Sequence, residues 1–589
     1  MRESPESYRP PRNAQELLSR YEKGERFFPC STLPQADLSG IDLTGSDLSG
    51  SSLQGVNLAK AVLQEVNLQD AFLLEANLQD ADLRWANLRG ADFRKVNFQQ
   101  ANLLGAKLRD ADLQDADFKG VKGLSAGQLG GTNVCGAKLP DEIKVFGELK
   151  NIEEASKHTG NLFFSLLVVC IYGWLTIGTT TDALLLTNSS SSPLPIVGAP
   201  VPIVAFYLTA PLFLLGFYLY LHLNLQRLWD ALADLPAIFP DGRSLEKKAY
   251  PWLLNGLVSA YFLRLKAYRP RLSRLQTGIS IFIAWWLGPA TILLFWARYL
   301  RRHDSLGTIL LIVLLSASIW GAVALHGLAA STLRGEETKP FFWRNAFRDK
   351  RTYKRGLFFL ALFAVLYLLS FGTIHGIHPD FASSAPPNSS LMSNLKVTDP
   401  KIWVPRFFIL LGYSPFADLR EVDISIKPPN FVGQRKEDIA LIKRARLKGS
   451  NLRFADAYRA FLAAADLSGA HLQGAYLFQA NLRGADLTWA DLQEAFLFET
   501  DLQWAILKRA NLRGVDLSGA NLREANLEEA QMEGAVLSET NLEGSNLRGA
   551  NLMQASGLTR KQIESALVDE KTRLPDYLRA ATEANRKAQ

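Results

Sequence analysis

Residues that could perform chemistry are sparse in this chain, and His375, His378 and Asp380 come closest to forming a cluster. Two histidines three residues apart, with a carboxylate nearby, can ligate a metal ion. Gly376 and Pro379 lie between them and are typical of a loop, and the sequence offers no further ligand. An ordinary interfacial loop is therefore the favoured interpretation, and we predict no metal site and no cofactor.

Motifs for common enzyme chemistry are missing from the sequence. It has no phosphate-binding Walker loop, no GxSxG nucleophile elbow and no HExxH zinc motif. The three cysteines are too widely separated for a disulfide framework or a zinc site; they are Cys30, Cys135 and Cys170. We therefore predict no catalytic residues and a protein that is not an enzyme.

A five-residue repeat dominates both ends of the chain. Leucine or phenylalanine occupies every fifth position from Leu38 to Phe118, and the pattern returns from Leu447 to Leu552, where Ala457 replaces one central leucine. A helix would spread such a repeat around its axis, and a flat strand would send it to alternate faces. The backbone must therefore turn within each repeat, so that every central side chain points into one interior.

The pattern A-(D/N)-L-x-x, seen for example at Ala76-Asn77-Leu78, resembles the pentapeptide-repeat family. The resemblance implies a mixed fold class with two right-handed quadrilateral β-helices, each coil containing four pentapeptides. We expect these solenoids over residues 33–145 and 445–556, with irregular early coils near Ala457. It also implies a bacterial source, but no activity, because the residues that define the family are structural.

Both repeat blocks are followed by matching sequences. Ser125 precedes Gln128 by three residues after the first block, and Thr559 precedes Gln562 in the same way after the second. Ser or Thr with Gln three residues later is a capping-box signature. We therefore predict that each stack finishes in a helix covering its last coil, with the C-terminal cap and tail over residues 557–589.

The middle of the chain, residues 146–420, is strongly apolar. Five runs are near the length of about 20 residues that crosses a hydrocarbon core of about 30 Å. They cover residues 161–178, 201–223, 278–297, 306–330 and 356–373, and 403–411 is a shorter sixth candidate. These runs predict an α-helical transmembrane domain, preceded by a polar leader over residues 1–32 and followed by a linker over residues 421–444.

Charge orients this membrane domain. Residues 36–120 carry a net charge of −5 and residues 445–554 a net charge of −4, so the +7 total leaves +16 elsewhere. The cations concentrate in residues 227–274 and 334–355, which the positive-inside rule places in the cytoplasm. The short turn at residues 298–302 carries three arginines, yet would face outward.

An odd number of spans would put the repeat blocks on opposite sides of the membrane. We expect both blocks to be cytoplasmic, at a bacterial inner membrane, with a further segment such as 403–411 or Pro251–Leu263 dipping in or crossing. Neither block carries a translocation signal, and the scattered cysteines fit a reducing compartment.

Polar residues in or beside the spans are candidates for function, because an intramembrane ionisable group usually pairs or lines a path. They are His222, His326 and Asp182. Hydrogen bonding to neighbouring helices is the favoured interpretation for the histidines. Large apolar residues outside the two inward repeat positions are candidates for binding a partner or for intrachain packing: Phe478, Trp489, Phe498 and Trp504.

Three hypotheses follow for function. The first is a non-enzymatic integral membrane scaffold that presents its solenoids to an unknown protein partner. Its other partner is the lipid bilayer. The sequence is also compatible with a homo-oligomer. The second is a channel, transporter or membrane effector regulated by the repeats. The third, a DNA mimic that binds topoisomerases like some soluble members of the resembled family, is disfavoured by the weak negative charge, and we expect no nucleic-acid partner.

Overall fold

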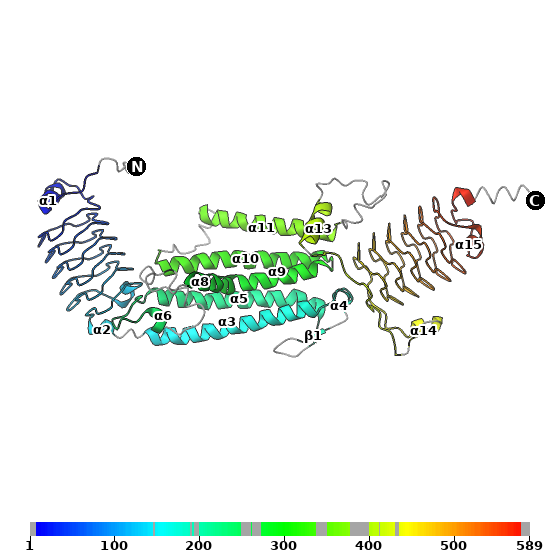
Figure 1. Cartoon of the computed structure of the whole chain (residues 1–589), viewed down its shortest axis with the longest axis horizontal. Helices are drawn as coiled ribbons and strands as arrows, with labels where there is room; N and C mark the ends of the chain where they lie inside the picture. Colours follow the sequence, from blue (N-terminus) through cyan, green and yellow to red (C-terminus); the bar gives the residue numbers. More distant parts are fainter. Residues whose placement is uncertain are drawn as a thin grey trace, which may run out of the picture. The chain divides into compact units, whose positions relative to one another are not determined.

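The structure is a computed structural model of the chain, and the parts that it describes are residues 8–144, 148–188, 191–193, 200–248, 261, 272–336, 350–376, 400–411, 413–429, 431 and 435–578. The chain divides into two compact units. The first unit comprises Met1–Val168, Leu215–Pro289 and Ser318–Asp349, and the second comprises Val169–Leu214, Ala290–Ala317 and Lys350–Gln589. Each unit contains one repeat block, shown as a stack of coils in Figure 1.

The first repeat block is a parallel β-helix with a coil of twenty residues. Isolated parallel bridges join residues twenty apart, as between Asn57 and Asn77, so one coil contains four pentapeptides. The central leucines and the small residues two positions earlier form one buried core. The predicted direction of the central side chains is therefore confirmed.

The Asp or Asn before each central residue explains how the backbone turns within five residues. Its side chain accepts a hydrogen bond from the amide two positions later, as between Asp42 and the nitrogen of Thr44 at 2.9 Å. Two residues after the central leucine the backbone enters the left-handed region, with φ near 60° even at Lys60 and Trp85. This conformation costs a non-glycine residue about 1 kcal/mol, and the polar turn and the ladder bonds offset that cost.

Each predicted capping box is present, but its helix does not end the stack. Ser125 is the N-cap of the 3₁₀-helix η2 (Ala126–Leu129), which contains Gln128, and Thr559 is the N-cap of the α-helix α15 (Arg560–Glu564), which contains Gln562. Strand pairing continues beyond both, through Asp117 with Lys138 and Asn551 with Arg573. The expectation that each stack finishes in a covering helix was wrong, because the residues after that helix add part of a further coil.

The two matching glutamines satisfy the carbonyl groups where the coil is interrupted. Gln128 Nε2 donates to the carbonyls of Leu103 and Ala106 at 2.9 and 2.8 Å. Gln562 Nε2 donates to those of Leu537 and Thr540 at 3.1 and 2.8 Å. The offsets in sequence are identical, which makes the two ends variants of one structural module.

We expect Gln562→Ala to loosen the end of the second block, because the Thr540 carbonyl loses its side-chain donor and the Leu537 carbonyl keeps only the Thr540 amide. Such a loss costs about 1–2 kcal/mol, which corresponds to about 5- to 30-fold faster local opening. Hydrogen exchange of residues 542–558 in the full chain measures this. Glu564→Ala, which removes only an exposed pair with Arg560 on the same helix, should leave exchange unchanged; equal exchange in both variants would contradict the role of Gln562.

Pairing in the second block begins before residue 445. Asp418 pairs with Asp456 and Asp423 with Phe461, so the end of the expected transmembrane domain and part of the expected linker belong to the first coil. The chain then leaves the coil and forms the helix α14 (Lys436–Ala440) before it returns. The ladder is regular at Ala457, whose amide donates to the Tyr476 carbonyl at 2.8 Å.

The first block is closed at both ends by segments outside the repeats. Helix α1 (Ala14–Glu22) places Leu17 in the core of its first coil. At the other end, the segment after helix α5 (Ile203–Ala233) pairs with the last strand: the amide of Gly131 donates to the Leu235 carbonyl at 2.9 Å, and Asn133 bridges Ile238. Covering an open strand edge in this way removes a site for unwanted association.

The middle of the chain is helical. Its elements are α2 (Asp141–Lys144), α3 (Glu148–Thr179), α4 (Asp182–Thr187), the hairpin β1 (Ser191–Pro193) and β2 (Pro200–Pro202), α5 (Ile203–Ala233), α6 (Leu245–Lys248), α8 (Ser273–Ile281), the π-helix η4 (Phe282–Trp286), α9 (Leu287–Leu300), α10 (Ser305–Arg334), α11 (Lys350–Ile374) and α13 (Pro400–Leu410). Within the described residues, five helices are long and apolar enough to cross a membrane. Four of them contain a predicted span, and the helix that begins at Ile203 contains all but the first two residues of the span predicted at 201–223, whereas α13 is too short.

Candidate functional site

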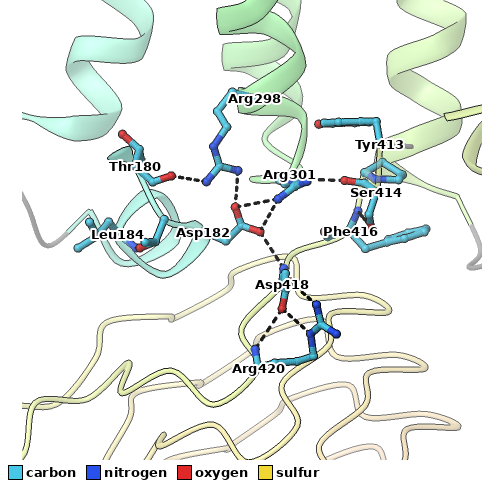
Figure 2. Close-up of polar contacts among 12 residues, drawn as sticks. Thr180, Asp182, Leu184, Arg298, Arg301, Tyr413, Ser414, Phe416, Asp418 and Arg420 are labelled. Carbon is cyan, nitrogen blue, oxygen red and sulfur yellow. Dashed lines mark hydrogen bonds and ion pairs between the residues drawn. The ribbon is translucent and has the colours of Figure 1, made fainter. Parts of the chain in front are cut away.

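Asp182, at the start of α4, is the centre of a cluster of charged hydrogen bonds (Figure 2). Its side chain is only 3% exposed and forms an ion pair with Arg298 through one carboxylate oxygen. The other oxygen accepts from Arg301 at 3.1 Å and from the backbone amide of Asp418 at 2.8 Å. One buried carboxylate therefore joins helix α4, the end of α9 and the first strand of the second repeat block.

The two arginines complete this junction through backbone carbonyls. Arg298 Nη2 donates to the Thr180 carbonyl at 2.5 Å, and Arg301 Nε donates to the Ser414 carbonyl at 2.9 Å. Arg420 in turn holds the Asp418 carboxylate at 2.7 Å and lowers the pKa of that carboxyl. We call Thr180, Asp182, Arg298, Arg301, Ser414, Asp418 and Arg420 the junction cluster.

These contacts explain the three arginines of the turn at residues 298–302. Arg302, the third of them, donates to the carbonyls of Leu185 and Leu186 at 2.5 and 3.2 Å. All three guanidinium groups are thus occupied by the ends of α3 and α4, by Asp182 or by the segment before the second block. They carry out a structural task and are a poor guide to membrane orientation.

The chemistry that the junction cluster offers is anchoring. It pairs two guanidinium groups with one carboxylate and several carbonyl groups, and buried pairs of this kind hold a specific geometry. The described residues hold no group of three or more His, Cys, Asp or Glu side chains that could bind a metal ion.

His303 lies beside the junction cluster, in the turn between α9 and α10. The ring is 6% exposed, and its Nε2 lies 3.1 Å from the Pro415 carbonyl. Burial lowers the pKa of His303 to about 4, and the Arg453 charge acts in the same direction, while the Pro415 carbonyl and Asn451 oppose it. The folded protein therefore holds this imidazole neutral at pH 7.

We expect the stability of the protein to fall on acidification because of His303. Its folded pKa lies below the ordinary value of 6.5, so the unfolded chain binds more protons between those two pH values. The free energy of unfolding is then undiminished above pH of about 6.5 and decreases by up to ~1.4 kcal/mol per pH unit down to pH of about 4. Melting temperatures of the detergent-solubilised protein test this.

The control variants for this pH dependence are His303→Gln and His471→Gln. The first should flatten the decrease in melting temperature with falling pH, since glutamine does not titrate in this range. The second changes an exposed histidine of the repeat face and should keep the wild-type slope. An unchanged slope in His303→Gln would contradict the assignment.

A second set of arginine contacts ties the first repeat block to helix ends in its own unit. Arg109 donates to the carbonyls of Ala233 at 3.1 Å and Leu333 at 2.7 Å, at the ends of α5 and α10. Arg89, one coil earlier on the same side, donates to the Gly335 carbonyl at 3.0 Å. Helix C-termini present unpaired carbonyls and a partial negative charge, so cations are favoured there.

The structure brings His222 and His326 to the same tryptophan. His222 Nε2 lies 3.1 Å from the Ala284 carbonyl in the π-helix η4, and its ring is 5.8 Å from that of Trp285. His326 packs against Trp285 at 5.0 Å, and its Nε2 lies 3.2 Å from the Tyr261 hydroxyl. A π-helix displaces carbonyls from the usual helical bonds, and His222 hydrogen-bonds one of them.

The weak metal candidates are not assembled in the described residues. His375 Nδ1 lies 3.3 Å from the Phe371 carbonyl, one helical turn earlier, while His378 and Asp380 lie outside the described residues. The three cysteines are unpaired.

The aromatic candidates of the second block lie in different settings. Phe478 stacks between Tyr458 and Phe498, with ring centroids 5.4 and 5.3 Å apart, and Phe498 is 38% exposed. Trp489 is 62% exposed, and the Arg509 guanidinium lies 5.0 Å from its ring centroid. Trp504 instead packs against the cluster that contains Ile439, Ile442, Phe461 and Ala463, so it takes part in intrachain packing.

The sequence pointed to Asp182, but its partners were missed. The sequence did contain an indication of Arg298 and Arg301, because three arginines in a turn that is expected to face outward need acidic or carbonyl partners. The sequence also indicates that Arg89 and Arg109 belong together. They are twenty residues apart at the same repeat position and so share one side of the stack. Nothing in the sequence indicated which helix ends they would contact.

Together these features define a repeat protein with two β-helical solenoids, each fastened to ends of apolar helices. The pentapeptide repeats family matches the chain in eight copies, over residues 31–58, 57–95, 86–122, 445–484, 485–523 and 516–554. Both repeat blocks of the chain belong to the pentapeptide-repeat family.

Solved structures similar to this chain include other pentapeptide repeat proteins. HetL from the cyanobacterium Nostoc, involved in heterocyst differentiation regulation, is 15% identical, with 96% of this chain and 98% of that chain covered and a TM-score of 0.16. A protein from the Arabidopsis thaliana thylakoid lumen is 36% identical over 18% of this chain and 81% of its own, with a TM-score of 0.15. Another Nostoc protein is 36% identical over 20% of this chain and 98% of its own, with a TM-score of 0.12. The comparison with curated proteins gives no match.

Proposed function

We propose that this protein is a non-enzymatic integral membrane scaffold that presents its two solenoids to a protein partner. The observation that carries the proposal is that each block is fastened by arginine contacts to helix ends, through Arg109 in one unit and the junction cluster in the other. Such contacts hold a solenoid in a set orientation, which suits presentation of a long surface.

Membrane insertion is supported by apolar side chains on the outside of the spans. Phe164, Leu175 and Phe213 are 66%, 62% and 73% exposed within the protein. In the first span, only 22% of an apolar stretch of 18 residues is buried. Surfaces of this kind require an apolar solvent, and helices satisfy their backbone groups without water. We therefore propose that the five helices cross a bacterial inner membrane.

Each block, we propose, is the right-handed quadrilateral solenoid that the family resemblance implies. Parallel bridges twenty residues apart, or four pentapeptides, support a coil with four sides.

We propose that the first block is cytoplasmic, because it contacts Ala233 and Gly335 at the start of the two basic loops. Keeping the second block in the cytoplasm as well requires an even number of crossings. The further candidate segment Pro251–Leu263 lies outside the described residues apart from Tyr261. With the five described helices as the crossings, we propose that the second block lies on the extracytoplasmic side, in place of the expected cytoplasmic one. Reporter fusions at the two ends test this, and activity of a cytoplasm-specific reporter at both ends would overturn it.

The exposed aromatic residues of the second block are the surface that we assign to the protein partner. Trp489 and the stacked pair Phe478 and Phe498 lie at repeat positions where polar residues are otherwise common. Aromatic side chains supply large contact areas at interfaces and often dominate their energetics.

Affinity purification from native membranes tests the scaffold. We expect a specific protein to co-purify with the wild type and to be lost in the double variant Trp489→Ala with Phe498→Ala. Trp85→Ala is the matched control, since Trp85 is also 62% exposed but belongs to the first block. Retention of the same protein by the double variant would reject the assigned surface.

A channel or transporter regulated by the repeats is the second candidate function. It is favoured by one observation, the direct connection of Asp418 in the second block to Asp182 and the end of α9. Reconstituted wild-type protein that conducts ions, with no partner recovered from membranes, would replace the scaffold by this function. The DNA-mimic alternative has no such support.

A further inference from the structure

A large cleft lies at the start of the second repeat block. Its volume is about 1010 Å³, and its walls come from α4, α14 and the first coils of the block. All of these segments belong to one compact unit. Binding sites for small molecules commonly have volumes of about 300–1,000 Å³, so the cleft has room for a lipid headgroup and part of its glycerol backbone.

The charged lining of the cleft is strongly positive. Four basic residues line it, namely Lys436, Lys443, Arg444 and Arg446, and Asp423 is its acidic residue. That carboxylate is engaged by Lys427 at 2.7 Å. None of the four cations forms an ion pair among the residues that the structure describes, so they are available to an anion.

The rest of the lining is largely apolar. Leu184 comes from α4, Ile442 is 6% exposed beside α14, and Ile426 and Ile506 remain 52% and 41% exposed. Trp504 adds an aromatic face. Exposed apolar side chains next to free cations match a ligand that has a negative head and a hydrocarbon body.

The position of the cleft along the chain places it beside the bilayer surface. Helix α4 begins at Asp182, three residues after the last residue of the span α3 at Thr179. If α3 crosses the bilayer, α4 lies at headgroup level. Lys and Arg side chains within a Debye length of a bilayer surface are attracted by anionic lipid headgroups.

We propose that this cleft binds the phosphate-bearing headgroup of an anionic phospholipid, with Lys443, Arg444 and Arg446 as its principal anion contacts. The inference rests on the proposed membrane insertion and does not depend on the protein partner. A lipid bound there would lie against α4 and thereby link the membrane surface to the first coils of the second block.

Native mass spectrometry of the full-length, detergent-solubilised protein tests the site with phosphatidylglycerol as the probe and phosphatidylcholine as the neutral comparison. The test variant combines Lys443→Ala, Arg444→Ala and Arg446→Ala, whose side chains are exposed. The matched control removes three exposed lysines from the first block, through Lys60→Ala, Lys119→Ala and Lys122→Ala. Melting temperatures establish that both variants are folded.

We expect the wild type and the control to retain phosphatidylglycerol in preference to phosphatidylcholine. The cleft variant should bind phosphatidylglycerol at least about tenfold more weakly. Equal retention by the cleft variant, or no preference over phosphatidylcholine, would overturn the proposal. Release of the lipid by inorganic phosphate at low concentration would also overturn it, because the site would then be one for a free anion.

Failure of this inference is distinguishable from failure of the proposed function. A protein that fractionates with membranes and captures its partner but shows no lipid preference loses only the lipid site. A protein that is recovered away from the membrane fraction loses the scaffold proposal itself.

Discussion

Asp182→Ala is expected to detach the second repeat block from the helices that hold it. The substitution leaves Arg298 and Arg301 largely buried, with side chains 14% and 24% exposed, and without their carboxylate. Removing one partner from a buried ion pair costs about 3–5 kcal/mol. The amide of Asp418 also loses its acceptor. The melting temperature in detergent should therefore fall, and trypsin should cleave after Arg420 more rapidly than in the wild type.

Two further variants separate the buried carboxylate from charge loss in general. Asp182→Asn keeps an acceptor oxygen in place and should give an intermediate loss. Glu529→Ala removes a carboxylate from the half-exposed pair with Arg509, and exposed ion pairs contribute little to stability. If Asp182→Ala were no more harmful than Glu529→Ala, the junction cluster would not anchor the block.

Arg109→Ala should have the second largest effect, on the first repeat block. Its guanidinium donates to carbonyls at the ends of both α5 and α10, and hydrogen bonds that involve a charged group contribute about 1.5–3 kcal/mol. Burial lowers the pKa of Arg109, yet the group stays charged because an arginine pKa is so high. We expect faster hydrogen exchange at residues 231–240 and 328–335 in the full chain.

The matched variants for this site are Arg109→Lys and Arg94→Ala. Lysine keeps the charge but not the planar fork that reaches two helix ends, so partial loss is expected. Arg94 forms an exposed pair with Asp92 in the same block, and its removal should leave exchange at those helix ends unchanged. Full protection in Arg109→Ala would show that the strand pairing of Ile238 holds the block by itself.

The repeat blocks could be predicted because their information is local. Each pentapeptide carries its own turn, through an Asp or Asn such as Asp42, and its own inward leucine, so the repeat specifies the fold without long-range knowledge. The capping boxes at Ser125 and Thr559 were equally readable. Their role at the very end of the stack was predicted wrongly, because later segments distant from the repeat pattern add strands.

The start of the second block could not be predicted from the repeat pattern. Asp418 and Asp423 pair as repeat residues, but the excursion through α14 separates them from the continuous pattern. The repeat pattern alone therefore predicts a block that begins at residue 445. The repeat position of Trp504 likewise predicts an exposed side chain, and only the tertiary structure places the apolar cluster that contains Ile439 of α14 and Phe461 against it.

By itself the sequence determined two solenoids, their polar faces, and five apolar helices of spanning length, because periodicity and hydropathy are properties of neighbouring residues. Only the tertiary structure decided what the charged residues do. Asp182 meets Arg298, Arg301 and Asp418 from segments more than a hundred residues away, and Arg109 meets helix ends in the same manner. Such partners are chosen by burial, since a charge removed from water must find a counter-charge or a carbonyl group, and folding determines which of these lies within reach.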